Sequence, residues 1–222
     1  MQKLSLISAH EYVLQVLDEI KNSDDFSMLE GAEGLDTMKL TEGFIIEAVI
    51  KAHKDAPSLL LDGKVAEGKT EAEAEGKIFS AEVKERVADI KMLKETVRLV
   101  SIKASDSPFV VADYASEESP IGRMQNNKYV RGTYDDPRLI VKKIWGNERM
   151  PEFYYYSTKD DTATFTVEYI PYPTYPSEVE ISDKLKYAVL SLLVSMVLDA
   201  LSLHDKAALY KAKYQEYLQT AR

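Results

Sequence analysis

Residues 63–70 read GKVAEGKT and match the phosphate-loop pattern G-x-x-x-x-G-K-[ST] at every fixed position. The fixed positions are Gly63, Gly68, Lys69 and Thr70. In a phosphate loop the backbone N–H groups surround the phosphates, the lysine neutralises their charge and the hydroxyl binds magnesium. The motif therefore raises the hypothesis of a nucleotide-binding enzyme that uses these residues.

The residues that follow this motif argue against nucleotide binding. A phosphate loop opens a helix that packs on a parallel sheet, so the next residues need an apolar face. Here they read EAEAEG, which offers only alanine and soon reaches Gly76. Phosphates would also be repelled by the glutamates at positions 67, 71, 73 and 75. We therefore predict a solvated loop without a bound cofactor, and we keep nucleotide binding as the alternative function.

The other polar residues show no catalytic or metal-binding arrangement. His10, His53 and His204 are far apart in the sequence and match no metal spacing, and we expect each on a helix surface or end. Aspartate pairs occur where a turn is expected, at positions 24–25, 135–136 and 160–161. The chain has no cysteine, which excludes disulfides and thiolate chemistry and suits a reducing compartment. These residues predict a protein that is not an enzyme and has no metal site.

Composition and charge limit the classes of partner. The chain has 222 residues, 45% of them hydrophobic, so it can bury a core in one domain or in two small ones. The formal net charge is −9, which disfavours wrapping of nucleic acid but allows DNA to slide past without sticking. The start of the chain lacks a signal-peptide core, and the longest apolar stretch, 187–201, is too short to cross a bilayer. We expect a soluble protein that is not secreted and has no membrane partner.

Helical periodicity marks the N-terminal part of the chain. Ser8 and Glu11 fit a capping box at the start of a first helix. Thr41 is expected to cap a second helix, which Pro57 ends. A third helix is expected from about 80 to 93, with a valine and isoleucine stripe.

The helical period returns near the C-terminus. A helix from about 182 to 200 is apolar over most of its surface, so we expect it to be central. A final helix from about 206 to 220 completes a helical hairpin. Tyr210, Tyr214 and Tyr217 are spaced for one face of that helix. They suit packing within the hairpin, which we favour, or contact with a partner.

Alternating residues and turn signals fill the middle of the chain, from 96 to 175. This pattern predicts an antiparallel β unit of about five or six strands. The order of helices, strands and helices predicts an α+β fold, in which both chain ends form one helical layer around a β insertion. The expected parts are a helical part at 1–95, the β insertion at 96–175 and the helical hairpin at 176–222.

The most aromatic stretch, MPEFYYYSTKDDTATFTVEYIPYP, spans residues 150–173. If KDD is a three-residue hairpin loop, the register places one apolar set on the core face: Phe153, Tyr155, Phe165 and Val167. The same register places an amphipathic set on the outer face: Tyr154, Tyr156, Thr164 and Thr166. Because such residues are enriched at protein interfaces, we predict that an adjacent subunit or ring covers this outer face.

Residues 97–222 resemble the head–tail connector proteins of tailed bacteriophages, and most closely the ring proteins of the crAss-like phages. The resemblance lies in the order of the strand-rich runs, the long apolar helix and the short helix rich in lysine and tyrosine. Its sharpest parts are Gln125 and Asn127 in a Q-x-N pattern, and the YIPYP exit from the last strand.

The resemblance implies a non-enzymatic protein of the virion, placed at the head–tail junction and assembled in the cytoplasm of the bacterial host. Such proteins form a closed ring, commonly a homo-dodecamer, beneath the portal protein. The ring joins the portal to the next tail or connector protein and lines the channel for DNA, without sequence-specific binding. A generic interaction module is the remaining hypothesis.

Overall fold

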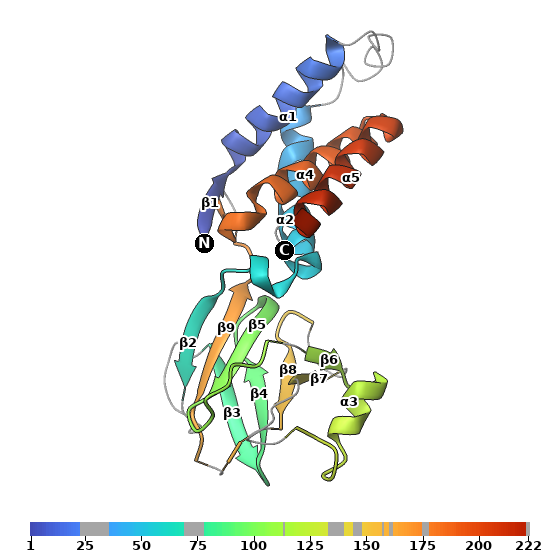
Figure 1. The fold of residues 1–222 in the computed structure, drawn as a ribbon. Helices are drawn as coiled ribbons and strands as arrows, with labels where there is room; N and C mark the ends of the chain where they lie inside the picture. Colours follow the sequence, from blue (N-terminus) through green and yellow to red (C-terminus); the bar gives the residue numbers. More distant parts are fainter. Residues whose placement is uncertain are drawn as a thin grey trace. The chain divides into compact units, whose positions relative to one another are not determined.

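The computed structural model describes residues 1–22, 36–68, 78–112, 114–132, 140–143, 148–156, 158–159, 162–174 and 178–220. The chain divides into two compact units. The helical unit comprises Met1–Asp62 and Pro173–Arg222, and the β unit comprises Gly63–Tyr172 (Figure 1). The α+β fold class is confirmed. The β unit begins well before residue 96, because segments expected to be loop and helix are strands.

Both ends of the chain contribute helices and one strand to the helical unit. Its helices are α1 (Leu6–Lys21), α2 (Thr37–Asp55), α4 (Lys186–Ala200) and α5 (His204–Thr220). The short 3-10 turns η2 (Ser58–Leu60) and η3 (Asp183–Leu185) accompany them. Strand β1 (Gln2–Ser5) pairs antiparallel with β10 (Glu178–Ile181). Helix α4 contacts α1, α2 and α5 and is buried on most of its surface, as its apolar sequence predicts.

The first two helices start earlier than their expected caps. Ser5 caps α1, because its Oγ accepts a hydrogen bond of 3.1 Å from the N–H of Ser8. Asp36 caps α2 through hydrogen bonds from the N–H groups of the next turn. Ser8 and Thr41 therefore lie inside helices, where each hydroxyl bonds a backbone carbonyl one turn back. A Ser or Thr suited to capping also suits this interior bond, so the expected positions were wrong.

His53 lies in the last turn of α2, at a helix end as expected, but its side chain is buried and not on the surface. Its Nε2 accepts a hydrogen bond of 3.2 Å from the N–H of Ser182, so Nδ1 carries the proton and donates to the carbonyl of Val49 at 2.8 Å. The Ser182 hydroxyl in turn accepts from the N–H of Asp62 at 3.1 Å. This chain of bonds joins α2 to the segments on either side of the β unit in the sequence.

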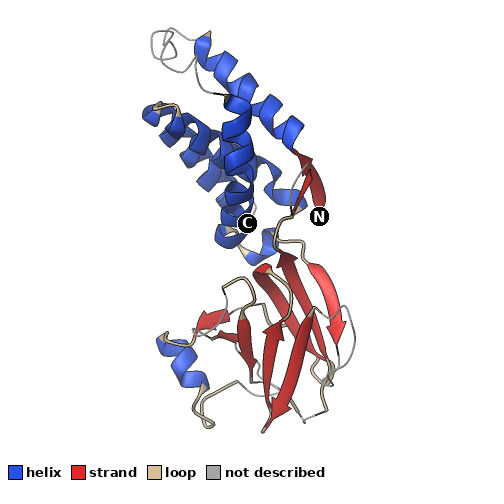
Figure 2. Ribbon diagram, turned by 180° about the vertical axis from the view of Figure 1, so that it is seen from behind, coloured by secondary structure: helices blue, strands red, loops and turns tan. Residues whose placement is uncertain are grey.

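Two sheets pack face to face in the β unit (Figure 2). One sheet has the order β2-β9-β5, with β2 (Lys64–Gly68), β9 (Phe165–Pro171) and β5 (Thr96–Ala104). The other has the order β3-β4-β8-β7-β6, with β3 (Phe79–Lys84), β4 (Val87–Met92), β8 (Glu152–Tyr155), β7 (Ile140–Lys142) and β6 (Tyr114–Ser116). Only the β6–β7 pair is parallel among these described strands. Helix α3 (Pro120–Gln125) follows β6.

The prediction of a helix at about 80 to 93 is wrong, because these residues form the β3–β4 hairpin. Its turn is made by Glu85 and Arg86, both with positive φ (51° and 64°). The inward residues include Ala81 opposite Ile90. Because alanine is only weakly apolar, alanines at core positions hide the alternation that marks a strand. The remaining valines and isoleucines have a spacing that also fits a helix, and this spacing led to the helix prediction.

The expected hairpin between β8 and β9 is also wrong. Strand β8 pairs with β4 and β7, whereas β9 pairs with β2 and β5 in the other sheet. The expected core face is nevertheless correct, because Phe153, Tyr155, Phe165 and Val167 are all buried in one cluster. The rings of Tyr155 and Phe165 meet edge to face across the two sheets, with centroids 5.8 Å apart.

Candidate interaction surfaces

The phosphate-loop match lies largely on a strand. Residues Lys64–Gly68 form β2 and pair with β9, so their backbone belongs to a sheet ladder and not to a cradle for phosphates. The N–H of Gly63 donates to the Glu168 carboxylate at 3.0 Å, and a side chain at position 63 would collide with Glu168. The prediction that this segment is a solvated loop is therefore wrong for the residues of β2. Lys69 and Thr70 lie outside the described residues.

The four residues predicted to share one outer face do not share it. Tyr154 lies on β8, whereas Thr166 lies on β9 in the facing sheet and Thr164 just precedes it. Because the core lies between the two sheets, their outer faces point in opposite directions. Tyr154, Thr164 and Thr166 are each partly buried. A single partner surface that covers all four residues is therefore excluded.

A partly buried lysine covers Tyr154. Lys143 Nζ lies 4.3 Å from the centroid of the Tyr154 ring and pairs with Asp89 at 2.7 Å and Glu152 at 3.0 Å. Burial disfavours the ammonium charge, but the hydrogen bonds to both carboxylates outweigh it, so the pKa of Lys143 is raised. Lys143 therefore stays charged and holds β7, β4 and β8 together at this face.

Tyr156 lies beside Tyr154 as predicted, with ring centroids 6.0 Å apart, and outside the core cluster. It is nevertheless only 6% exposed, because its own chain covers it and not an adjacent subunit. Its hydroxyl donates to Asn126 Oδ1 at 2.8 Å, and the Arg131 guanidinium lies 5.9 Å from its ring centroid. Burial raises the pKa of Tyr156 to about 12. The side chain thus anchors the segment that contains α3 to the sheet.

Replacing Tyr156 with phenylalanine is expected to lower the free energy of unfolding at neutral pH by about 1 kcal/mol, because the bond to Asn126 is lost. The raised pKa also predicts that native Tyr156 stabilises the fold below about pH 10 and loses this contribution as the pH rises to about 12. Urea titrations at about pH 9 and pH 11.5 should therefore show a smaller alkaline loss of stability in Tyr156→Phe than in the unaltered protein. Equal losses would contradict this role.

The segment Ser119–Gly132, which we call the α3 segment, is closed by its own hydrogen bonds. Ser119 caps α3 by accepting from the N–H of Gly122, and the buried Gln125 side chain accepts from the N–H of Gly132 at 2.8 Å. Asn127 Oδ1 accepts from the N–H of Tyr129 at 3.0 Å. The Q-x-N pattern of the resemblance is therefore a pair of local backbone caps that give this segment its shape.

The tyrosines of α5 divide between core and surface. Tyr210 and Tyr214 are buried, and the Tyr214 hydroxyl donates to Asp55 of α2 at 2.9 Å. Burial and this hydrogen bond raise the pKa of Tyr214. Tyr217 is exposed and stacks on Tyr187 of α4, with ring centroids 6.0 Å apart. The stack of Tyr217 on Tyr187 is packing within the hairpin, as predicted, whereas the Tyr214 hydroxyl contacts α2 outside the hairpin. Tyr217 is still 41% exposed and so remains available to a partner.

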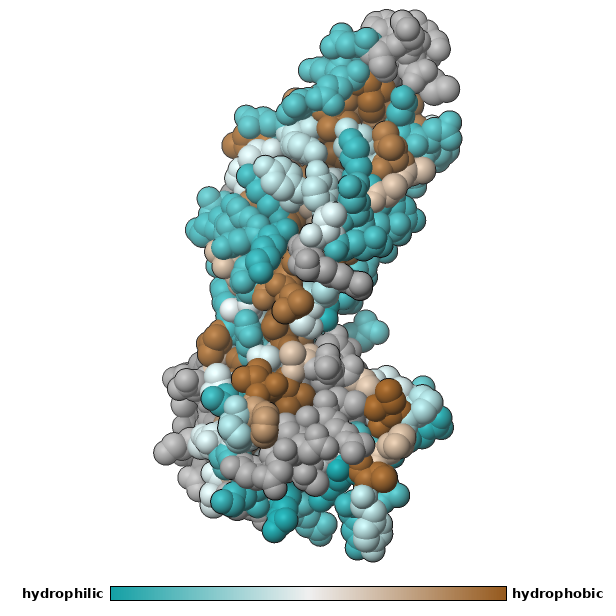
Figure 3. All heavy atoms as spheres, in the orientation of Figure 1, coloured by the Kyte–Doolittle hydropathy of each residue, from teal (hydrophilic) through white to brown (hydrophobic). Residues whose placement is uncertain are grey.

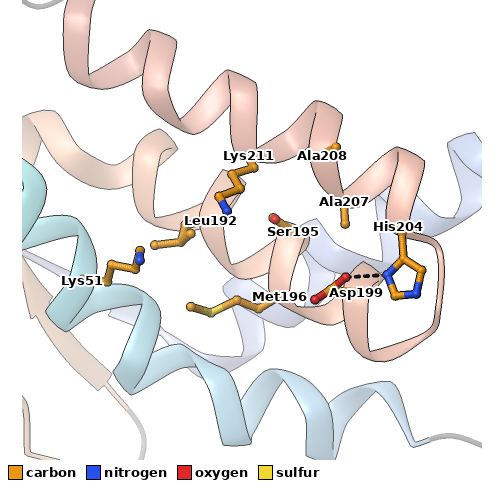
Figure 4. A pocket seen from close by; sticks show the side chains of 9 residues that line it. All are labelled: Lys51, Leu192, Ser195, Met196, Asp199, His204, Ala207, Ala208 and Lys211. Carbon is orange, nitrogen blue, oxygen red and sulfur yellow. Dashed lines mark hydrogen bonds and ion pairs between the residues drawn. The ribbon is translucent and has the colours of Figure 1, made fainter.

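A pocket of about 300 Å³ opens between α2, α4 and α5 (Figure 4). Lys51 and Lys211 line it together with Ser195, and His204 Nδ1 lies 2.6 Å from Asp199 Oδ1 at one side. Serine, histidine and aspartate are the residue types of a hydrolytic triad. However, the Ser195 hydroxyl lies apart from the His204 ring in Figure 4, and His204 and Asp199 are mostly exposed. This arrangement cannot activate the serine.

No group of acidic and histidine side chains in the described part of the chain is arranged to hold a metal ion. None of the helices described here has the length and hydropathy of a membrane span. A scan against models of protein families finds no match, and a search of curated protein sequences finds none either.

Proposed function

We propose that this chain is a structural protein of a phage virion that forms a closed ring in the head–tail connector. In this role it links the portal protein to the next tail component and lines the DNA channel, with a homo-dodecamer as the expected ring. The resemblance of residues 97–222 to connector proteins motivates the proposal. The α+β fold with a C-terminal helical pair is compatible with it.

The observation that carries this proposal is that both units leave large apolar or aromatic side chains exposed. On the helical unit the most exposed of them include Ile7, Leu59, Tyr187, Leu209 and Tyr217. On the β unit they include Val65, Val110, Ile121, Met124 and Tyr129. Scattered exposure is ordinary, but exposed tyrosines that lie together, as Tyr187 and Tyr217 do with ring centroids 6.0 Å apart, are typical of protein contacts. A ring subunit needs such contacts on both of its sides.

The acidic charge suits a DNA conduit. With a formal net charge of −9, the chain repels phosphates on average and disfavours tight binding of DNA. Passage of DNA through the ring during ejection requires this weak, sequence-independent interaction.

Electron microscopy and native mass spectrometry of the purified protein, alone and mixed with the portal protein of the same phage, test the proposal. We expect closed rings that seat on the portal, with a mass that gives the copy number. A chain that stays monomeric with portal present would overturn the proposal. Magnesium-dependent ATP binding that is lost in Lys69→Ala would favour the nucleotide-binding alternative instead.

A further inference from the structure

The α3 segment (Ser119–Gly132) concentrates exposed apolar surface on a rigid support. Tyr129 is 84% exposed and Ile121 is 55% exposed, and Met124 and Val130 are exposed beside them in the sequence. Hydrophobic surface gathers at the position of α3 in the space-filling view (Figure 3). Hydrogen bonds hold this segment in place at two points, from Tyr156 to Asn126 and from Arg131 to the carbonyl of Glu85. Such apolar surface on an ordered support, with arginine nearby, is typical of an interface core.

The charge of the α3 segment is opposite to that of the whole chain. It carries Arg123, Lys128 and Arg131 and no carboxylate, although the chain has a net charge of −9. Arg131 is engaged within the chain, with Glu85 and the Tyr156 ring. Arg123 and Lys128 are exposed. An apolar and basic surface fits an apolar and acidic one, and isoleucine and methionine side chains favour a protein partner over the phosphates of DNA.

Helix α1 presents an apolar and acidic surface. Ile7, Glu11, Leu14 and Asp18 follow one another at spacings of four, three and four residues, so they form one stripe along the helix. All are exposed, with Ile7 at 65%. None of the ion pairs between described residues includes Glu11 or Asp18. We call this row the α1 stripe.

We propose that the α3 segment of one copy docks on the α1 stripe of a second copy. Ile121, Met124 and Tyr129 then cover Ile7 and Leu14, while Arg123 and Lys128 pair with Glu11 and Asp18. The two surfaces differ, so the contact is heterologous and repeats from copy to copy, which is the type of contact that closes rings. This inference rests on the proposed function for its biological setting, and it names the elements that would make the ring contact.

Charge exchange tests the contact without disturbing the core, because all the altered side chains are exposed. Arg123→Glu with Lys128→Glu, or Glu11→Lys with Asp18→Lys, should each reduce the assembled fraction at least about tenfold in sedimentation velocity, with portal present. All four substitutions in one chain should restore assembly. Reversal of two other exposed lysines, Lys51→Glu with Lys211→Glu, should leave it intact. Equal loss in that control, or no rescue, would overturn the contact.

Disulfide trapping gives a second readout that does not depend on ring formation. The natural chain has no cysteine, so Met124→Cys in one sample and Leu14→Cys in another introduce single thiols. Oxidation of the mixture at high protein concentration should yield the heterodimer well above either homodimer. Rings that form without this product, and that tolerate charge reversal, would overturn the contact and leave the proposed function standing. The heterodimer without any ring on the portal would support the contact and reject the proposed function.

Discussion

Replacing Phe165 with alanine should destabilise the β unit by roughly 3 to 5 kcal/mol, the usual cost of deleting a buried aromatic ring. Phe165 is 2% exposed and meets the Tyr155 ring edge to face from the opposite sheet. The truncation would leave a cavity between the two sheets and remove that ring contact. Because single domains have total stabilities of about 5 to 15 kcal/mol, the variant should unfold at much lower urea concentration.

Val65→Ala is the matched control for this result. Val65 lies on β2, which pairs with the strand that carries Phe165, but 65% of its surface is exposed. Its truncation should change the free energy of unfolding by less than about 1 kcal/mol. Equal losses of stability for both variants in urea titrations would contradict the conclusion that Phe165 packs between the two sheets.

His53→Ala should destabilise the helical unit by roughly 2 to 4 kcal/mol. The substitution leaves a cavity beneath α2 and removes the acceptor of the Ser182 N–H, which is buried with the ring. A buried donor without a partner is costly because it has given up its bond to water. Circular dichroism at 222 nm during thermal unfolding follows the helices directly, so the loss should be visible as a lower melting temperature.

His204→Ala provides the comparison with an exposed histidine. The His204 side chain is 72% exposed, and its bond to Asp199 lies at the surface. Exposed pairs of this kind contribute about 0 to 1 kcal/mol, so the melting temperature should barely change. A loss in His204→Ala as large as that in His53→Ala would mean that the buried hydrogen bond between His53 and Ser182 does not stabilise the helical unit.

Helical segments with strong apolar stripes were predictable from the sequence. The central helix α4 and the following α5 lie where the periodicity places them, and the end of α2 precedes Pro57. These features depend on local rules, because a helix satisfies its own backbone and needs only one apolar face. The strands of the β3–β4 hairpin were missed since alanine carries little apolar signal, although it fills a narrow space between sheets well.

Surface assignments were less predictable than core assignments. The sequence placed Phe153, Tyr155 and Phe165 in the core correctly, because alternation shows which residues share a face. It placed Tyr156 on the face away from the core, beside Tyr154, but did not show that Tyr156, just after β8, is covered by Asn126 of the α3 segment. No local pattern reveals that a segment distant in sequence folds over a given ring.

By itself, the sequence determined the α+β class, the central helix and the identity of the core aromatics, because propensity and periodicity act over a few neighbouring residues. Only the tertiary structure decided that β8 and β9 belong to facing sheets, that the residues after Gly63 form a strand, and which tyrosines remain exposed. Strand pairing joins residues far apart in the chain, and the same alternating strand can pair with several partners. Exposure, in turn, depends on every segment that packs nearby.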